Sequence, residues 1–231
     1  MNILQALDDP AVFRPWFERG DWTAWRAFLA ALFGLSLTDR ERTLFEAHTR
    51  RVTPPAEPFA EAALVIGRRG GKSFVLAVLA IFLACFRDYR QYLQPGECAT
   101  ILVVAADRKQ ARTIMRYAAG LLENVPMLQP LIERQSTEEI ELKRRVVIEV
   151  ATASFRTVRG RTIAAALLDE LAFGEATRPA PTRIPRSWRR SAQRWRPSRA
   201  RCCSWHRHLM LGEASCGGHS RSTSAGTTPA C

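Results

Sequence analysis

The stretch Gly67-Arg68-Arg69-Gly70-Gly71-Lys72-Ser73 determines how this chain of 231 residues is interpreted. It follows the apolar run at residues 63–66 and precedes a long apolar segment at residues 74–86. A strand, a glycine-rich loop and a helix in this order are typical of a phosphate-binding P-loop, in which backbone N–H groups surround a polyphosphate. Lys72 adds a positive charge for the phosphates, and the Ser73 hydroxyl suits Mg2+. We therefore predict that residues 67–73 bind ATP together with Mg2+.

The spacing of this loop departs from the usual P-loop pattern. Three residues, rather than the usual four, separate Gly67 from Gly71. The alternative interpretation is an accidental Gly-Lys-Ser turn.

A second segment supports the P-loop interpretation. The apolar run at residues 163–168 ends in Asp169 and Glu170. In P-loop ATPases the first acid at the end of such a strand coordinates Mg2+ through water, and the next acid polarises the water that attacks the γ-phosphate. We predict Asp169 as the Mg2+ residue and Glu170 as the catalytic base. The alternative is a solvated Asp-Glu pair that caps a following helix.

The arginines inside the loop narrow the choice of P-loop family. With Arg68 four residues before Lys72, the loop resembles that of the large terminase subunit of tailed phages, the ATPase motor that pumps DNA into the capsid. Two further segments share this resemblance: Ile-Leu-Val-Val-Ala-Ala-Asp-Arg-Lys-Gln-Ala-Arg at residues 101–112 and Thr-Val-Arg-Gly-Arg-Thr at residues 157–162. The resemblance covers roughly residues 35–176.

This resemblance implies the ATPase motor portion of a DNA-packaging enzyme. It implies that Arg68 acts in cis as a catalytic arginine finger, whereas the alternative is a surface arginine that the loop tolerates. The implied partners are double-stranded DNA, a small terminase subunit, a portal protein and further copies of the chain, in the cytoplasm of a bacterial host. Two other functions stay open: another nucleic-acid-dependent P-loop ATPase of the helicase type, and a non-enzymatic basic fragment that binds nucleic acid.

The net charge of +12 is concentrated in the last part of the chain. Residues 1–177 hold 23 Lys and Arg against 21 Asp and Glu, whereas residues 178–231 hold 11 Arg, no Lys and one acid. The basic charge therefore says little about the partner of the preceding region. Within that region, the basic segment at residues 156–161 either contacts DNA phosphates or a neighbouring subunit, or forms a solvated turn.

The tail at residues 178–231 allows three interpretations. A zinc site is disfavoured because its cysteines and histidines lack the usual ligand spacing; they are Cys202, Cys203, His206, His208, Cys216 and His219. An arginine-rich arm would use Trp188, Trp195 and Trp205 to stack on bases. The third interpretation is translation out of frame, because codons for residues 206–217 permit Ser-Ser-Pro-Tyr-Ala-Arg-Arg-Gly-Glu-Leu-Trp in a shifted register. We hypothesise a frameshift near residues 174–183.

The hydrophobic pattern predicts an α/β fold with a P-loop NTPase-type parallel sheet flanked by helices. We expect strands at about residues 62–67, 99–106, 145–152 and 163–168, and helices at about residues 72–87 and 108–124. Thr38 and Glu41 form a capping box for a helix that extends to about Ala47. The aromatic residues between positions 15 and 33 predict a core-facing helical pair.

Three regions follow from these patterns: an N-terminal helical region (1–58), an incomplete ATPase core (59–177) and a disordered or irregular basic tail (178–231). The core is incomplete because the terminase resemblance implies a coupling-motif strand between the P-loop strand and the Asp-Glu strand, and a later nuclease, and we expect neither here. Without that strand its two neighbours would lie about 9–10 Å apart. Three outcomes are then possible: the P-loop strand and the Asp-Glu strand pair directly, residues of the tail fill the space between them, or the protein is unstable. We predict no membrane segment, because the run at residues 74–86 is too short to span a bilayer.

Overall fold

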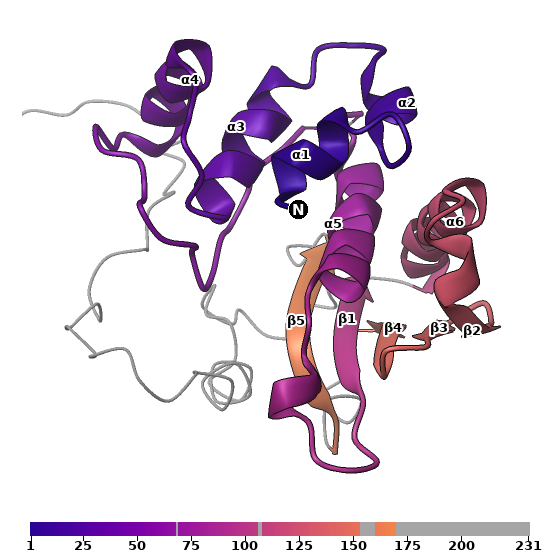
Figure 1. Ribbon diagram of the computed structural model, residues 1–231. Coiled ribbons are helices and arrows are strands. Elements are labelled where there is room, and N and C mark those ends of the chain that lie inside the picture. The colour runs from indigo at the N-terminus through magenta and orange to yellow at the C-terminus, as the bar shows by residue number, and fades with distance from the viewer. Residues whose placement is uncertain (68, 106–107, 153–159, 170–231) are drawn as a thin grey trace, which may run out of the picture. The chain divides into compact units, whose positions relative to one another are not determined.

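The computed structural model describes residues 1–67, 69–105, 108–152 and 160–169 (Figure 1). The chain divides into two units, Met1–Arg196 and Pro197–Cys231, and every described residue belongs to the first. Arg68, Glu170 and all the tail residues considered above therefore lie outside the described part. The division at residues 58 and 177 stays a prediction.

Four helices precede the glycine-rich loop: α1 (Ile3–Asp8), α2 (Arg14–Phe17), α3 (Thr23–Leu32) and α4 (Asp39–Thr49). The predicted capping box at the start of α4 is confirmed, since Thr38 Oγ1 accepts from the Glu41 N–H at 3.3 Å and Glu41 Oε2 accepts from the Thr38 N–H at 2.9 Å. A second capping box, formed by Asn2 and Gln5, begins α1, which the sequence reasoning did not predict.

The rest of the described chain forms further helices and the strands of one five-stranded sheet. In chain order these elements are α5 (Lys72–Phe86), η1 (Arg90–Tyr92), β1 (Ala99–Ala105), α6 (Arg108–Asn124), η2 (Gln129–Leu131), β2 (Ile132–Gln135), β3 (Glu139–Leu142), β4 (Val146–Thr152) and β5 (Thr162–Asp169). The strand order is β2-β3-β4-β1-β5. Strand β1 pairs in parallel with both β4 and β5, whereas β2, β3 and β4 pair antiparallel. The predicted α/β fold, with parallel strands flanked by helices, is confirmed.

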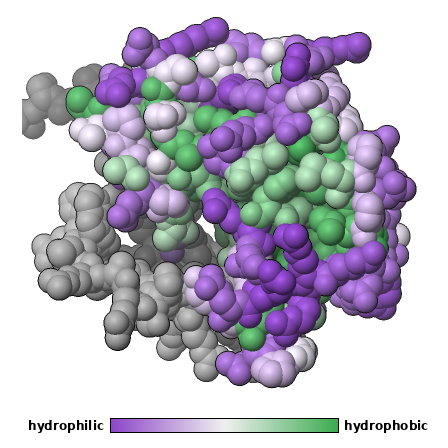
Figure 2. Space-filling view, viewed as in Figure 1, coloured by the Kyte–Doolittle hydropathy of each residue, from purple (hydrophilic) through white to green (hydrophobic). Residues whose placement is uncertain are grey.

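Helices α5 and α6 pack on one face of the sheet. Their apolar residues share a core with the odd-numbered residues of β1, which are Ala99, Ile101, Val103 and Ala105. Leu102 and Val104 face the other way and join a smaller cluster with Ala151 and Ile163. Hydrophobic side chains also reach the surface around α5 (Figure 2). No helix in the described ranges is long and apolar enough to cross a membrane.

The strand predicted at residues 62–67 is wrong. Residues 61–67 have no regular secondary structure and are mostly exposed, and Val65 is fully exposed. A strand needs a neighbour for its backbone N–H and C=O groups. In the described residues the outer edge of β5 is bonded to no strand, and residues 62–66 are bonded to none. These residues thus have the composition of a strand, but no described strand pairs with them.

This difference is testable by one pair of matched substitutions. We expect Val103→Ala to lower the free energy of unfolding by about 2 kcal/mol, because Val103 is fully buried in β1. We expect Val65→Ala to change it by less than about 0.5 kcal/mol, because the side chain already contacts water. Urea denaturation of both variants measures the two values. Equal losses would show that residues 62–66 form a buried strand.

Candidate functional site

The glycine-rich loop and the acidic strand meet in the structure. Ser73, on the first turn of α5, and Asp169, the last residue of β5, are 96 residues apart in sequence. The Ser73 hydroxyl donates to Asp169 Oδ2 at 3.3 Å. Asp169 is one of the few buried polar residues, with 3 % of its surface exposed. A buried carboxylate requires hydrogen-bond donors, and Ser73 supplies one of them.

A bulge in β5 determines which face of the sheet Asp169 occupies. Ile163 pairs with Thr100, but the next β1 residue, Ile101, pairs with Ala165, so Ala164 is an extra residue. Side chains of a regular strand alternate between faces, and one inserted residue reverses the alternation. Ile163 therefore joins the smaller cluster, whereas Leu167 joins the core beneath α5 and α6. Asp169, paired with Ala105, lies on that same face as α5.

The start of α5 has the features of an anion site. Gly71 occupies the position before the first helical residue and adopts the left-handed conformation, with φ of 75°. It offers no side chain to cap the helix, so the first N–H groups of α5 have no side-chain acceptor at the capping residue. Such donors, together with the positive end of the helix dipole, favour a bound anion.

Two tryptophans of the N-terminal region contact this loop at Gly70 and Gly71. Trp25 Nε1 donates to the Gly70 carbonyl at 2.8 Å. A Cβ atom added to Gly71 would lie 3.2 Å from the Trp22 ring, and the Trp22 and Phe74 rings lie 6.1 Å apart. Both tryptophans also pack against the core, as the aromatic pattern predicted. Their contact with the loop was missed, because no local pattern shows which distant backbone an indole reaches.

Gln110 is a further site residue that the sequence reasoning missed. It lies on the first turn of α6, and its Nε2 donates to Asp169 Oδ2 at 3.1 Å. The sequence pattern indicated its position only weakly. The helix after a buried parallel strand begins at the carboxyl edge of the sheet, where polar side chains gather, and Gln110 lies at the start of such a helix. Asp169 Oδ2 therefore accepts from two helices, α5 and α6.

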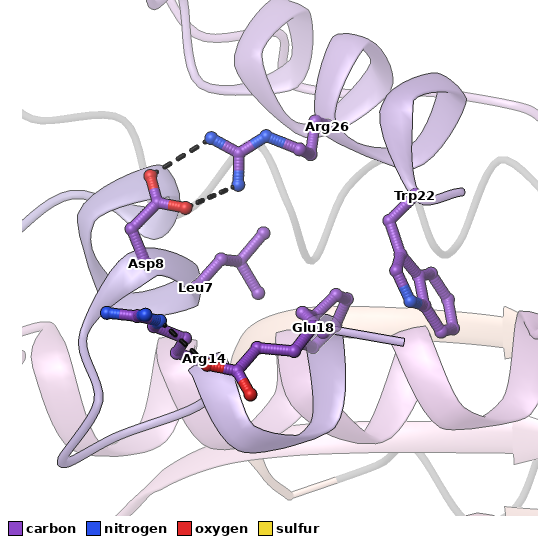
Figure 3. A pocket seen from close by; sticks show the side chains of 7 residues that line it. Leu7, Asp8, Arg14, Glu18, Trp22 and Arg26 are labelled. Carbon is purple, nitrogen blue, oxygen red and sulfur yellow. Dashed lines mark hydrogen bonds and ion pairs between the residues drawn. The ribbon is translucent and has the colours of Figure 1, made fainter. Parts of the chain in front are cut away.

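A pocket of about 340 Å³ lies among the N-terminal helices (Figure 3). It is lined by Leu7, Asp8, Arg14, Phe17, Glu18, Trp22 and Arg26. Its charged groups pair with one another: Arg26 donates to both Asp8 oxygens at 2.7 and 3.0 Å, and Arg14 to Glu18 at 2.9 Å. The hydrogen bond to Asp8 raises the pKa of Arg26. This pocket contains none of the predicted site residues, and we place the candidate site at Ser73 and Asp169.

One basic residue considered for DNA contact has a partner within the chain. Arg161 forms an ion pair with Glu149 of β4, with an N–O distance of 2.6 Å. Burial raises the pKa of Glu149, and Arg161 opposes that rise. Arg161 thus serves the packing of the sheet, while the rest of the segment at residues 156–159 lies outside the described residues.

Comparison with solved structures finds similarity to the large terminase of bacteriophage HK97. The TM-score is 0.41, the sequence identity is 18 %, and the match covers 59 % of this chain and 27 % of that one. The chain thus matches about a quarter of the length of that terminase. No family model and no curated protein matches the chain.

The packing of Trp22 on the loop predicts unequal costs for two glycine substitutions. Gly71 and Gly96 both have left-handed backbones, with φ of 75° and 86°, but a Cβ at Gly96 meets nothing within 4 Å. We expect Gly96→Ala to lower the free energy of unfolding by about 1 kcal/mol from backbone strain alone. Gly71→Ala should lose roughly 1 kcal/mol more, because its Cβ crowds the indole. Chemical denaturation measures both.

A Trp22→Leu background supplies the control for this comparison. Without the indole, the difference between the two alanine variants should vanish. A difference that persists in that background would contradict a direct contact between Trp22 and the loop.

Proposed function

We propose that this chain is the ATPase motor portion of a phage or prophage large terminase, which hydrolyses ATP to drive DNA into a capsid. The observation that carries the proposal is the contact between Ser73 and Asp169 across 96 residues of sequence. A glycine-rich loop, a helix start and a buried acid at the carboxyl edge of a parallel sheet form the arrangement in which P-loop proteins bind nucleotides. The arginine-bearing loop and the segments at residues 101–112 and 157–162 support the assignment to a packaging motor.

The residues at this edge fit Mg2+. A hydroxyl and a carboxylate are the oxygen ligands that this cation prefers, and phosphates of the substrate supply others. A site of this kind needs few protein ligands. This agrees with the described part of the chain, where no cluster of three or more His, Cys, Asp or Glu side chains could hold a metal by itself. Bound Mg2+ would neutralise charge on the β- and γ-phosphates.

Each predicted residue has a role in this proposal. The amides of residues 67–71 and the Lys72 ammonium bind the phosphates of ATP, and Ser73 and Asp169 hold the cation. Glu170 orients and deprotonates the attacking water, and Arg68 stabilises the charge that develops on the transferred phosphoryl group. Double-stranded DNA, a small terminase subunit and a portal protein are the proposed partners, and the host cytoplasm is the proposed location.

We expect this product to bind nucleotide better than it hydrolyses it. In the described residues, the segment before the loop pairs with no strand, and the N-terminal region contacts the loop through Trp22 and Trp25. Catalysis by a P-loop depends on precise positioning of the phosphates, and small displacements reduce it strongly.

Substitution of Lys72 tests the proposal. We expect Lys72→Ala to weaken binding of a fluorescent ATP analogue in the presence of Mg2+ by roughly 10- to 100-fold. Loss of a charge-assisted hydrogen bond costs about 1.5–3 kcal/mol, and each 1.4 kcal/mol is about tenfold in affinity. Titration of the purified full chain, followed by fluorescence anisotropy, measures the change.

Lys143→Ala is the matched control, because Lys143 is an exposed lysine in the turn between β3 and β4. It should bind the analogue like the wild type. Equal binding by the Lys72→Ala variant would overturn the nucleotide site. Robust ATP turnover that depends on Lys72 would keep the site and overturn the expectation of a weak enzyme.

A further inference from the structure

Gln110 connects a third structural element to the proposed ATP site. Asp169 ends β5, Ser73 begins α5, and Gln110 lies on the first turn of α6. Both Ser73 Oγ and Gln110 Nε2 donate to the same carboxylate oxygen, Asp169 Oδ2, at 3.3 and 3.1 Å. Since a carboxylate only accepts hydrogen bonds, the nitrogen of the Gln110 amide is the atom that faces it.

The two donors differ in how firmly they hold the carboxylate. A serine hydroxyl rotates freely about its C–O bond, and the terminal torsion of an aspartate is broad and roughly two-fold. Ser73 alone therefore leaves the orientation of the Asp169 carboxylate loosely defined. The Gln110 amide is planar, and its N–H directions are fixed once its side chain is placed.

The helix that carries Gln110 is itself held in place. Ala111, the next residue, is fully buried, and so is Ile114 one turn later. Both belong to the core that α6 shares with α5 and β1. A side chain at the start of such a helix holds its position better than one on a loop. The β1–β5 pairing, in which Ala105 lies opposite Asp169, brings the start of α6 next to the carboxylate.

We propose that Gln110 is a positioning residue of the cation site, which orients the Asp169 carboxylate toward Ser73. This inference rests on the proposed function. Gln110 contacts neither substrate nor cation in this role and acts through Asp169. Loss of such an outer partner typically weakens metal affinity by about 10- to 100-fold. The phosphate contacts made by the loop and Lys72 do not pass through Gln110, so its loss should separate cation binding from nucleotide binding.

The experiment titrates Mg2+ into the full chain with a fluorescent ATP analogue and repeats the analogue titration in EDTA. We expect Gln110→Met, which keeps the length of the side chain and removes its donor, to raise the half-saturating Mg2+ concentration about tenfold. The affinity measured in EDTA should stay within about two-fold of the wild type. Gln110→Ala should behave in the same way, and agreement between the two excludes an effect of the methionine sulfur.

Thr113→Val is the matched control, because Thr113 lies one turn further along α6 and its hydroxyl donates to the Lys109 carbonyl rather than to the site. It should leave both titrations unchanged. Wild-type Mg2+ dependence in Gln110→Met would overturn the positioning role, and so would an equal loss of nucleotide affinity with and without Mg2+, which indicates general damage to the fold. A wild-type chain that shows no Mg2+-dependent binding would instead overturn the proposed function, and the positioning role with it.

Discussion

The parallel pairing of β5 with β1, with its one-residue bulge, is the constraint on which the candidate site depends. Before the bulge Ile163 faces the smaller cluster, and after it Leu167 and Asp169 face α5. Without the extra residue at Ala164, the alternation would turn Asp169 to the opposite face, away from Ser73. Bulges near functional sites often redirect a side chain in this way. Here the redirected group is the buried acid that joins two helices.

Helix packing places the other residues of the candidate site next to Asp169. Helix α5 is a 15-residue apolar segment that packs on the sheet through its buried residues, so its first turn is fixed relative to the end of β5. Trp22 and Trp25 add contacts from α3 and its cap to the loop before α5. Single contacts of this kind contribute about 1 kcal/mol each. They are small beside the burial of α5, and they serve the conformation of the loop more than the stability of the fold.

Local patterns predicted the elements whose formation depends on local sequence and burial. The runs at 99–106, 145–152 and 163–168 appear as β1, β4 and β5 with ends shifted by one residue, and α5 and α6 match within one residue. Burial on both faces makes such strands continuously apolar, which is a strong signal. The hairpin of β2 and β3 was not predicted, because its short strands carry charged residues such as Arg134 and Glu141. The bulge, the Gln110 contact and the Trp25 contact were not predicted. Each depends on residues that are far apart in the sequence, and a local sequence pattern does not show which of them meet.

The strand predicted at residues 62–67 is not formed, and this affects two parts of the candidate site differently, although the sequence pattern predicts them together. The contact between Ser73 and Asp169, where we propose the cation site, forms because α5 packs on β1 and β5, and it needs no strand before the loop. Residues 67–71, where we propose that the phosphates bind, would normally lie between a strand and a helix. In the described residues no strand pairs with the segment before them, and Trp25 contacts the Gly70 carbonyl. Exposure of Leu64 and Val65 is the visible consequence. In the function that we propose, the contact between Ser73 and Asp169 would form without an extended neighbour for β5, whereas the positions of the phosphates would depend on such a neighbour.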